Sequence, residues 1–238
     1  MRGARVLVVL FFLATSSTAF AATKAIKFSR LVDGIGGVFT NAVVIVEDDR
    51  VQSIASGNAP IPSGAEVIDL SRYTGIPGLI DAHTHITYYW DGNTTPRFEP
   101  PRHPAVAAFL AQENAQKALE AGVTTIRNLN AAEGTDLAMR DLINMGRMIG
   151  PRMFVSGLGI RITRSTAPPA PIGIMADGVD AVIHAVRQVI ASGADWVKMF
   201  GSTGGFDDVT EFQTFTFEEM KAAVDATHAL GKKIAIHS

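Results

Sequence analysis

The feature that most constrains the fold is an alternation, from Pro77 onward, of short apolar runs with amphipathic helical segments. Strands that alternate with helices in this order predict an α/β unit with a parallel sheet and right-handed crossovers. An eight-stranded barrel needs eight strands, whereas an open doubly wound sheet can close with five, so the order alone leaves both open. The predicted strands occupy residues 77–85, 123–129, 151–157, 194–201 and 232–238, and the predicted helices residues 105–122, 135–146, 179–193 and 217–231.

The segment before Pro77 has a different texture, because strand-like runs are separated by turns and no helical period is present. Strands are predicted over residues 25–32, 41–55 and 65–70, where the second range reads as two strands joined by a turn at Asp48 and Asp49. We expect a small antiparallel β-unit here.

The first 22 residues have the order of a secretory signal peptide. Arg2 and Arg5 precede an apolar run over residues 6–14, which is too short to span a bilayer. Ala19 and Ala21 stand like the small residues of a cleavage site. We expect export to the periplasm or the extracellular space after cleavage near Ala21. The chain is thus divided into residues 1–22, 23–76 and 77–238.

Composition excludes several classes of function. The net charge is −2 and cysteine is absent, so neither a nucleic-acid partner, nor a disulfide framework, nor a thiolate metal site is expected. Hydrophobic residues make up 47% of the chain, which favours a packed core over disorder. We expect no membrane association of the mature form, and a homo-oligomer remains an open alternative to a monomer.

Three of the predicted strands end in residues that suit metal binding. His83 and His85 are two residues apart, so in a strand they project from the same face. They lie at the carboxyl end of the first strand of the α/β unit, where such folds place their sites. His237 ends the fifth strand in the same way. Imidazoles placed together can share a divalent cation.

Lys198 lies inside the apolar fourth strand of this unit. A buried lysine without a partner is costly, and its pKa falls, which makes the neutral amine available for reaction. Such an amine can form a Schiff base with a carbonyl substrate, or take up CO2 to become an anionic carbamate. The alternative without chemistry is a lysine at a strand end that reaches solvent with its ammonium group. Tyr88, Arg127 and Arg161 lie near strand ends and are candidates for contacts with a substrate.

Five stretches together, "PGLIDAHTH", "AGVTTIRNL", "GPRMFVSG", "GADWVKMFGSTGG" and "ALGKKIAIHS", resemble the metal-dependent amidohydrolase superfamily, in its imidazolonepropionase-like and Xaa-Pro-dipeptidase-like branch. The resemblance covers residues 24–238. It implies a TIM-type (β/α)8 barrel with a β-sandwich, and one or two divalent ions, usually zinc, that activate a water. It also implies that His83 and His85 bind a first metal, that His237 binds a second, and that Lys198 is the carboxylated bridging ligand.

The sequence departs from the family pattern in two places that bear on function. Asn128 stands where many relatives have an aspartate, and the Gly-Gly-His that often follows the third strand is absent. Relatives also carry a further histidine on strand six and a catalytic aspartate on strand eight. We therefore expect a barrel truncated after its fifth strand, with the general-base aspartate beyond the end of this chain and only part of the sandwich present.

The leading hypothesis is the N-terminal fragment of a hydrolase that cleaves the carbon–nitrogen bond of a small amide, cyclic amide or dipeptide. Two other hypotheses are kept. A metal-binding remnant without turnover would retain the ligands but lack the missing aspartate. A Schiff-base aldolase would use Lys198 and leave the three histidines unexplained.

Overall fold

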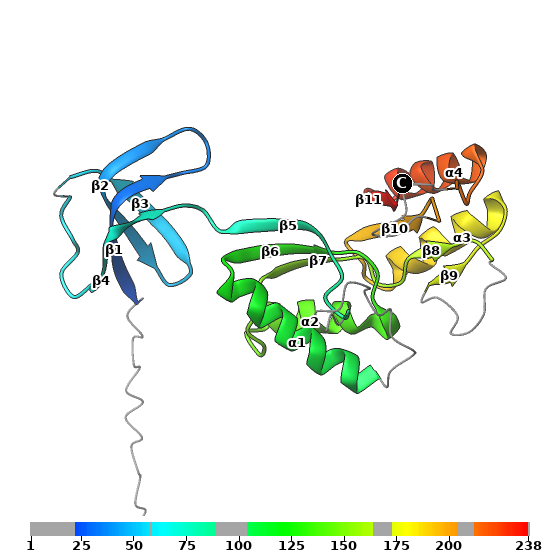
Figure 1. Cartoon of the computed structure of the whole chain (residues 1–238), viewed down its shortest axis with the longest axis horizontal. Helices are drawn as coiled ribbons and strands as arrows, with labels where there is room; N and C mark the ends of the chain where they lie inside the picture. The colour runs from blue at the N-terminus through cyan, green and yellow to red at the C-terminus, as the bar shows by residue number, and fades with distance from the viewer. Residues whose placement is uncertain (1–21, 58, 89–103, 164–172, 204–211, 238) are drawn as a thin grey trace, which may run out of the picture. The chain divides into compact units, whose positions relative to one another are not determined.

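A computed structural model describes residues 22–57, 59–88, 104–163, 173–203 and 212–237, and the chain divides into two compact units, residues 1–77 and 78–238 (Figure 1). The predicted signal peptide falls almost entirely outside the described residues. No helix in the described ranges is both long and apolar enough to cross a bilayer.

The N-terminal unit contains one four-stranded sheet. Its strands lie in the order β3-β2-β1-β4, where β1 pairs with β2 and β2 with β3 in antiparallel fashion. The predicted turn lies between β2 and β3, and Asp48 has the positive φ of 52° that a tight turn requires. The strands are β1 Thr23–Val32, β2 Val38–Glu47, β3 Arg50–Ala55 and β4 Glu66–Gly75.

The prediction of a purely antiparallel unit is wrong for the last strand. β4 pairs with β1 in parallel, with Lys24 opposite Glu66 and Leu31 opposite Gly75. The ten-residue connection after β3 returns the chain to the opposite edge of the sheet, so that β4 runs alongside β1 rather than against it. Both faces carry apolar side chains. Val43 and Ile45 pack under residues 59–65 on one face, and Ala42 and Val44 lie on the other.

The second unit begins with three parallel strands in the order β5-β6-β7. α1 ends at Glu120, and Gly122 follows with a φ of +82°, a conformation that glycine adopts without strain. The apolar faces of α1 and α2 pack on Ile126 and Met153 of the sheet. The elements are β5 Leu79–Thr84, α1 Pro104–Glu120, β6 Val123–Asn128, the 3-10 turn η1 Ala132–Gly134, α2 Thr135–Asn144 and β7 Arg152–Val155.

The rest of the unit forms a second sheet in the order β11-β10-β8-β9, also parallel. The Thr-x-x-Glu pattern of Thr216 and Glu219 forms a capping box at the start of α4, because the Thr216 hydroxyl accepts from the Glu219 amide at 3.2 Å and the Glu219 carboxylate accepts from the Thr216 amide at 2.7 Å. The two-residue strands β8 and β9 were not predicted. The elements are β8 Ile160–Arg161, β9 Ile174–Met175, α3 Val179–Ala191, β10 Trp196–Phe200, α4 Phe217–Ala229 and β11 Lys233–His237.

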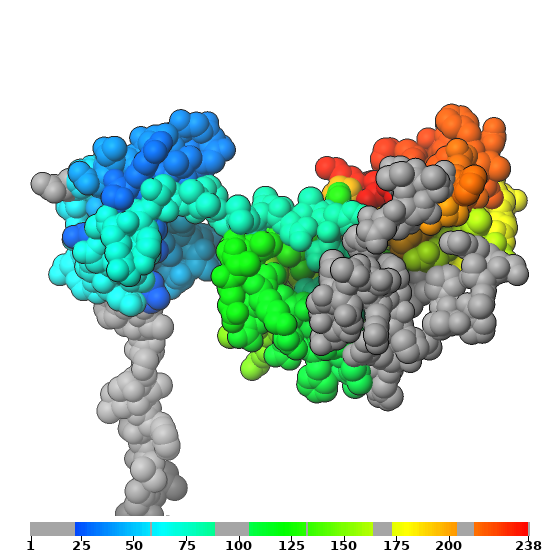
Figure 2. Space-filling view, in the orientation of Figure 1, coloured from blue at the N-terminus to red at the C-terminus, as the bar shows by residue number. Residues whose placement is uncertain are grey.

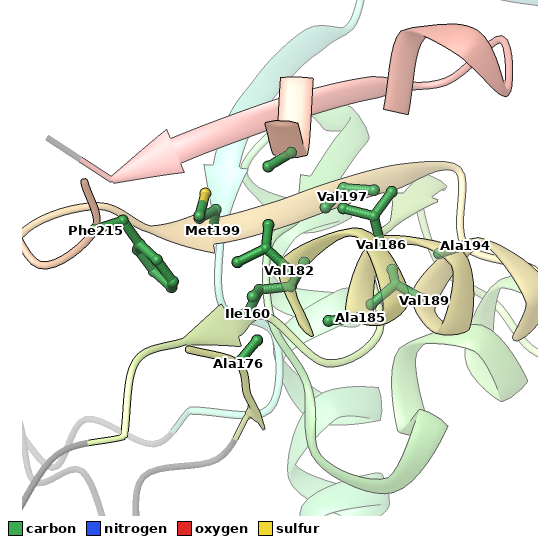
Figure 3. Close-up of a cluster of buried hydrophobic side chains, with 11 residues drawn as sticks. Ile160, Ala176, Val182, Ala185, Val186, Val189, Ala194, Val197, Met199 and Phe215 are labelled. Carbon is green, nitrogen blue, oxygen red and sulfur yellow. The ribbon is translucent and has the colours of Figure 1, made fainter. Parts of the chain in front are cut away.

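One face of β10 forms the main core of this second sheet. Val197 and Met199 are fully buried against Val182 and Val186 of α3, together with Phe215 (Figure 3). The opposite face of β10 therefore carries Trp196, Lys198 and Phe200, since side chains alternate along a strand. The apolar face of α3 fixes which side of β10 is left for polar residues.

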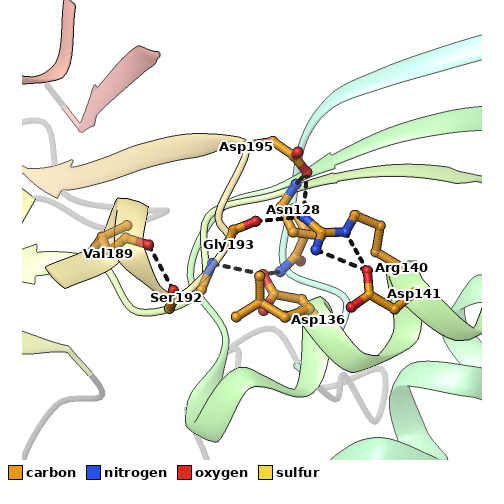
Figure 4. Close-up of polar contacts among 11 residues, drawn as sticks. Asn128, Asp136, Arg140, Asp141, Val189, Ser192, Gly193 and Asp195 are labelled. Carbon is orange, nitrogen blue, oxygen red and sulfur yellow. Dashed lines mark hydrogen bonds and ion pairs between the residues drawn. The ribbon is translucent and has the colours of Figure 1, made fainter. Parts of the chain in front are cut away.

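The two sheets of the α/β unit meet at Asp195, immediately before β10. Its amide donates to the Val155 carbonyl at 2.8 Å, and its carboxylate accepts from the Val155 amide at 3.0 Å. Arg140 of α2 donates to the same carboxylate at 3.1 Å and to the Gly193 carbonyl at 2.8 Å (Figure 4). The Asp195 carboxylate thus takes the place of a backbone carbonyl in the hydrogen bonding between β7 and the start of β10. The described strands form an α/β arrangement of two sheets and not a closed barrel.

Candidate functional site

The predicted metal ligands lie at the carboxyl ends of strands of the α/β unit. His83 is the penultimate residue of β5, and His85 follows one residue after the strand ends. His237 ends β11, where it stands opposite Phe200 of β10, two residues beyond Lys198. Because all these strands are parallel, their carboxyl ends face the same side of the unit. The fold therefore gathers residues that are far apart in the sequence.

His83 and His85 lie close together, with ring centroids 5.2 Å apart and ring planes at 60°. His85 is half-buried, and its Nδ1 atom is buried without a hydrogen-bond partner among the described residues. Buried polar atoms normally have hydrogen-bond partners, so a buried imidazole nitrogen without one is available to bind a ligand.

The charge state of His85 is set by its surroundings. Its pKa is lowered to about 4, mainly by burial and also by the positive charges of His83, Lys198 and His237, whereas a hydrogen bond with the Asn130 backbone acts in the opposite direction. His85 is therefore neutral at physiological pH. A neutral imidazole is the form that binds metal ions.

His83 responds to the same neighbours. Partial burial lowers its pKa, as do Lys198, Arg127 and His237, while Asp81 acts in the opposite direction. Lys198 and His237 thus affect both imidazoles of the pair. The structure brings His83, His85, Lys198 and His237 into one electrostatic cluster.

Lys198 is 1% exposed, which makes it the largest fully buried side chain among the described residues. Its pKa is lowered to about 8, mainly by burial and also by the positive charges of Arg161 and Arg127. Its Nζ atom lies 5.0 Å from the centroid of the Phe200 ring. The alternative of a lysine that reaches solvent is wrong, because the whole side chain is enclosed. A substantial fraction of such an amine is neutral near pH 8.

Arg127 and Arg161 are both engaged within the protein. Arg127 donates through Nε to the Ala82 carbonyl at 2.6 Å, and its guanidinium carbon lies 4.5 Å from the centroid of the Trp196 ring. The guanidinium carbon of Arg161 lies 3.3 Å from the centroid of Phe200. Both cations thus stack on the face of β10 that carries Lys198.

Tyr88 lies directly on the histidine pair. Its ring stacks on His85 at a centroid distance of 4.5 Å and an interplanar angle of 7°. Its hydroxyl accepts from the Asn130 side-chain amide at 3.3 Å. Asn130 is fully buried and adopts a φ of +86°, an uncommon conformation for a residue other than glycine. Tyr88 is therefore placed against a candidate ligand.

Sequence reasoning singled out Asn128 but missed that it belongs to a set of buried polar residues around this cluster. Asn128, Asn130, Asp136 and Ser156 are all fully buried and hydrogen-bonded. A signal was present for the first two, because Asn128 ends β6 and Asn130 stands two residues further on, at the carboxyl end of a parallel strand. No local signal marks Asp136, since an acidic residue in the first turn of a helix is ordinary.

The donors present fit a divalent cation. Two imidazoles share a face, one of their buried nitrogens lacks a partner, and an enclosed amine with a lowered pKa lies within their electrostatic reach. Within the described part of the chain, no three side chains of the His, Cys, Asp and Glu types converge on one ion position. The histidine pair is thus the centre of the candidate site, and Lys198 and His237 are its neighbours on the other sheet.

Comparison with known proteins gives a consistent result. Residues 74–238 match the Amidohydrolase family. The chain is 29% identical over 260 residues to an ochratoxinase of Aspergillus niger, covering 94% of this chain and 52% of that protein. It is 27% identical over 196 residues to an imidazolonepropionase of Micrococcus luteus, covering 74% of this chain and 47% of that protein. The chain spans about half the length of the curated relatives it matches.

A solved structure gives the same result at the level of the fold. The crystal structure of a Xaa-Pro dipeptidase with bound methionine in the active site superposes with a TM-score of 0.78 and 28% identity, covering 91% of this chain and 57% of that one. The resemblance noted in the motifs is therefore confirmed by a family match over more than half of the chain. The protein belongs to the amidohydrolase family.

Proposed function

We propose that this chain carries part of the active site of a metal-dependent hydrolase that cleaves a carbon–nitrogen bond in a small amide, cyclic amide or dipeptide. The observation that carries the proposal is the cluster of His83, His85, Lys198 and His237 at the carboxyl ends of parallel strands. Relatives named as an ochratoxinase, an imidazolonepropionase and a Xaa-Pro dipeptidase support the class of reaction.

His83 and His85 would hold the metal ion, with His237 and a carboxylated Lys198 as further ligands. A divalent ion, with zinc as the expected metal, supplies Lewis-acid polarisation of the substrate and makes a water molecule easier to deprotonate. The low pKa of His85 keeps this imidazole neutral and able to donate its electron pair through the physiological range. The Tyr88 ring shields one face of His85 from water.

The surroundings of Lys198 favour its carboxylation. A neutral amine is the form that attacks CO2, and the lowered pKa of about 8 makes that form accessible at mildly alkaline pH. The attack joins Nζ to the carbon of CO2, one C–O π pair becomes the carbamate oxygen charge, and the amine releases a proton. Arg127 and Arg161, which lower the pKa of the ammonium form, are positioned to offset the negative charge of the carbamate.

Metal content and turnover test the proposal with matched variants. We expect purified protein to retain a divalent metal, and His83→Ala or His85→Ala to lose metal together with chelator-sensitive hydrolysis of a panel of N-acyl amino acids, dipeptides and cyclic amides. His184→Ala is the control, because His184 is exposed on α3 and lies at none of the strand ends that carry the cluster. Lys198→Ala should lose metal as well, and small carboxylates that replace the carbamate should restore part of it.

Other outcomes separate the alternative hypotheses. Full metal content and activity in His83→Ala and His85→Ala would overturn the proposal. Metal that binds tightly without hydrolysis of any substrate would indicate a remnant. Borohydride trapping of a carbonyl compound on Lys198, absent in Lys198→Ala, would indicate Schiff-base chemistry, for which the pKa of about 8 is also suitable.

A further inference from the structure

A buried polar bridge joins the segment that follows His85 to the first turn of α2. We propose that Asn128 and Asp136 are a matched pair of positioning residues, which holds the His83–His85 segment in place through the backbone amide of Ile86. The proposal deepens the function proposed above and rests on it where metal binding is concerned.

The bridge consists of short hydrogen bonds. The Ile86 amide donates to Asn128 Oδ1 at 2.7 Å, and Asn128 Nδ2 donates to Asp136 Oδ2 at 3.0 Å. Asp136 also accepts from the Gly157 amide at 3.1 Å and from the Leu137 amide at 2.9 Å. Asn128 and Asp136 are 0% exposed, so water does not replace these partners.

The hydrogen bonds of the bridge run in one donor-to-acceptor order, and this order limits which residue types can occupy positions 128 and 136. A carboxylate only accepts hydrogen bonds, whereas an amide has one accepting and one donating end. Asn128 must turn Oδ1 toward Ile86 and Nδ2 toward Asp136, and Asp136 then receives three N–H donors. An aspartate at residue 128 would place two acceptors against each other with no donor between them. Position 128 therefore accepts an amide because position 136 carries a carboxylate.

The bridge holds the turn after β5, which contains His85. Ile86 directly follows His85, and the Leu129 amide donates to the Thr84 carbonyl at 3.0 Å on the other side of His85. Asn114 of α1 donates to the Ile86 carbonyl at 2.8 Å and to the Tyr88 carbonyl at 2.9 Å. The backbone around His85 is thus tied to both β6 and α1.

Backbone anchoring matters here because no acidic side chain among the described residues is hydrogen-bonded to the His85 ring. Metal-binding histidines commonly donate their second nitrogen to a carboxylate or a carbonyl, which fixes the ring. Among the described residues, the Nδ1 atom of His85 has no such partner, and the ring is placed by stacking on Tyr88, by a hydrogen bond with the Asn130 backbone and by its own backbone. A shift of the Ile86 amide would therefore move the imidazole directly.

The experiment compares Asn128→Asp, Asp136→Asn and the double exchange Asn128→Asp/Asp136→Asn in the full chain, with Co2+ alone as the probe. Each single exchange should weaken Co2+ binding by roughly 10- to 100-fold and change the visible absorption bands that report ligand geometry. The double exchange restores a donor between residues 128 and 136 but turns the amide nitrogen of residue 136 toward the Gly157 amide, which Asp136 Oδ2 accepts in the wild type, so it should recover part of the lost affinity and shift the bands back toward those of the wild type. Asn144→Asp and Asp180→Asn, which alter exposed residues, are the matched controls.

A second measurement does not depend on metal. Hydrogen exchange of the Ile86 amide, followed by NMR in metal-free protein, should be faster by at least about tenfold in Asn128→Asp and slow again in the double exchange. Unchanged Ile86 exchange in the single variants would overturn the bridge. If the wild type and both controls bind no Co2+, the proposed function fails, and the exchange data still decide whether the bridge exists. Lower stability with wild-type Co2+ affinity and bands would show a purely structural pair.

Discussion

The two units of this chain bury different kinds of side chain. In the described residues of the N-terminal unit, all the buried side chains are apolar, among them Ala25, Val43 and Val44. The α/β unit also buries a lysine, an aspartate and two asparagines. Burial of a polar group costs free energy unless a partner compensates it. Packing of apolar side chains is enough to explain the N-terminal sheet. The buried polar groups of the α/β unit cost free energy, and this cost points to a functional role.

The buried polar groups of the α/β unit divide again by how they are compensated. Asp136 and Asn128 satisfy each other and three backbone amides. Among the described residues, the charged neighbours that act on the pKa of Lys198 are the cations Arg161 and Arg127. A satisfied network stiffens the region around it, but an amine surrounded by cations destabilises the fold. The satisfied groups surround the candidate site, and the uncompensated group lies inside it.

The largest effect is expected from removing core volume in the α/β unit. Ile160 is 0% exposed and packs against α3, so Ile160→Ala should lower the free energy of unfolding by about 2–5 kcal/mol. Hydrogen exchange followed by mass spectrometry should show the loss of protection in the α/β unit, while β1 and β2 keep theirs. Ile80→Ala is the control, because Ile80 is 71% exposed and β5 lies at the surface in Figure 2. Equal loss of protection in both units would break the comparison.

The next effect concerns the uncompensated lysine. The pKa of Lys198 is lowered from 10.5 to about 8, so between these pH values the unfolded chain binds more protons than the folded chain. The stability of the metal-free wild type should therefore rise with pH from about 8 to about 10.5, by on the order of 2 kcal/mol relative to Lys198→Met. The variant should be the more stable of the two at pH 7.

Urea unfolding in the presence of chelator, at several pH values, measures this difference. Lys221→Met is the control, because Lys221 is exposed on α4, and its pH dependence should match that of the wild type. If the free energy of unfolding of Lys198→Met also follows that of the wild type from pH 7 to 10.5, a further partner stabilises the charged form of Lys198.

The smallest effects compare ion pairs of the two units. Arg140 has a side chain 16% exposed and joins the two sheets through Asp195 and Gly193, so Arg140→Ala should cost about 1–2 kcal/mol. The Lys24–Glu66 pair of the N-terminal sheet is 3.5 Å long and largely exposed, so Lys24→Ala should change stability by less than about 0.5 kcal/mol. Thermal unfolding of both variants measures the two costs, and similar values would contradict the contrast between the units.

Much of the local structure could be predicted from the sequence. The period of the apolar residues located α1 to α4 and the five main strands of the α/β unit, and Thr216 with Glu219 marked the start of α4. The two-residue strands β8 and β9 could not be predicted, because two residues contain no period. They exist only because the Ile160 and Arg161 backbone meets neighbouring segments, as in the bond from the Ile174 amide to the Gly159 carbonyl at 2.8 Å.

The sequence by itself determined which elements form and that His83 and His85 share a face, because helical period, capping and strand alternation depend on residues a few positions apart. Only the tertiary structure decided that β4 runs parallel to β1, that Lys198 lies enclosed beside Arg127 and Arg161, and that Asn128 bridges Ile86 to Asp136. These facts depend on contacts between segments far apart in the chain. Burial and hydrogen bonding in such contacts set the pKa values and the cost of each polar group, and neither quantity exists before the strands are brought together.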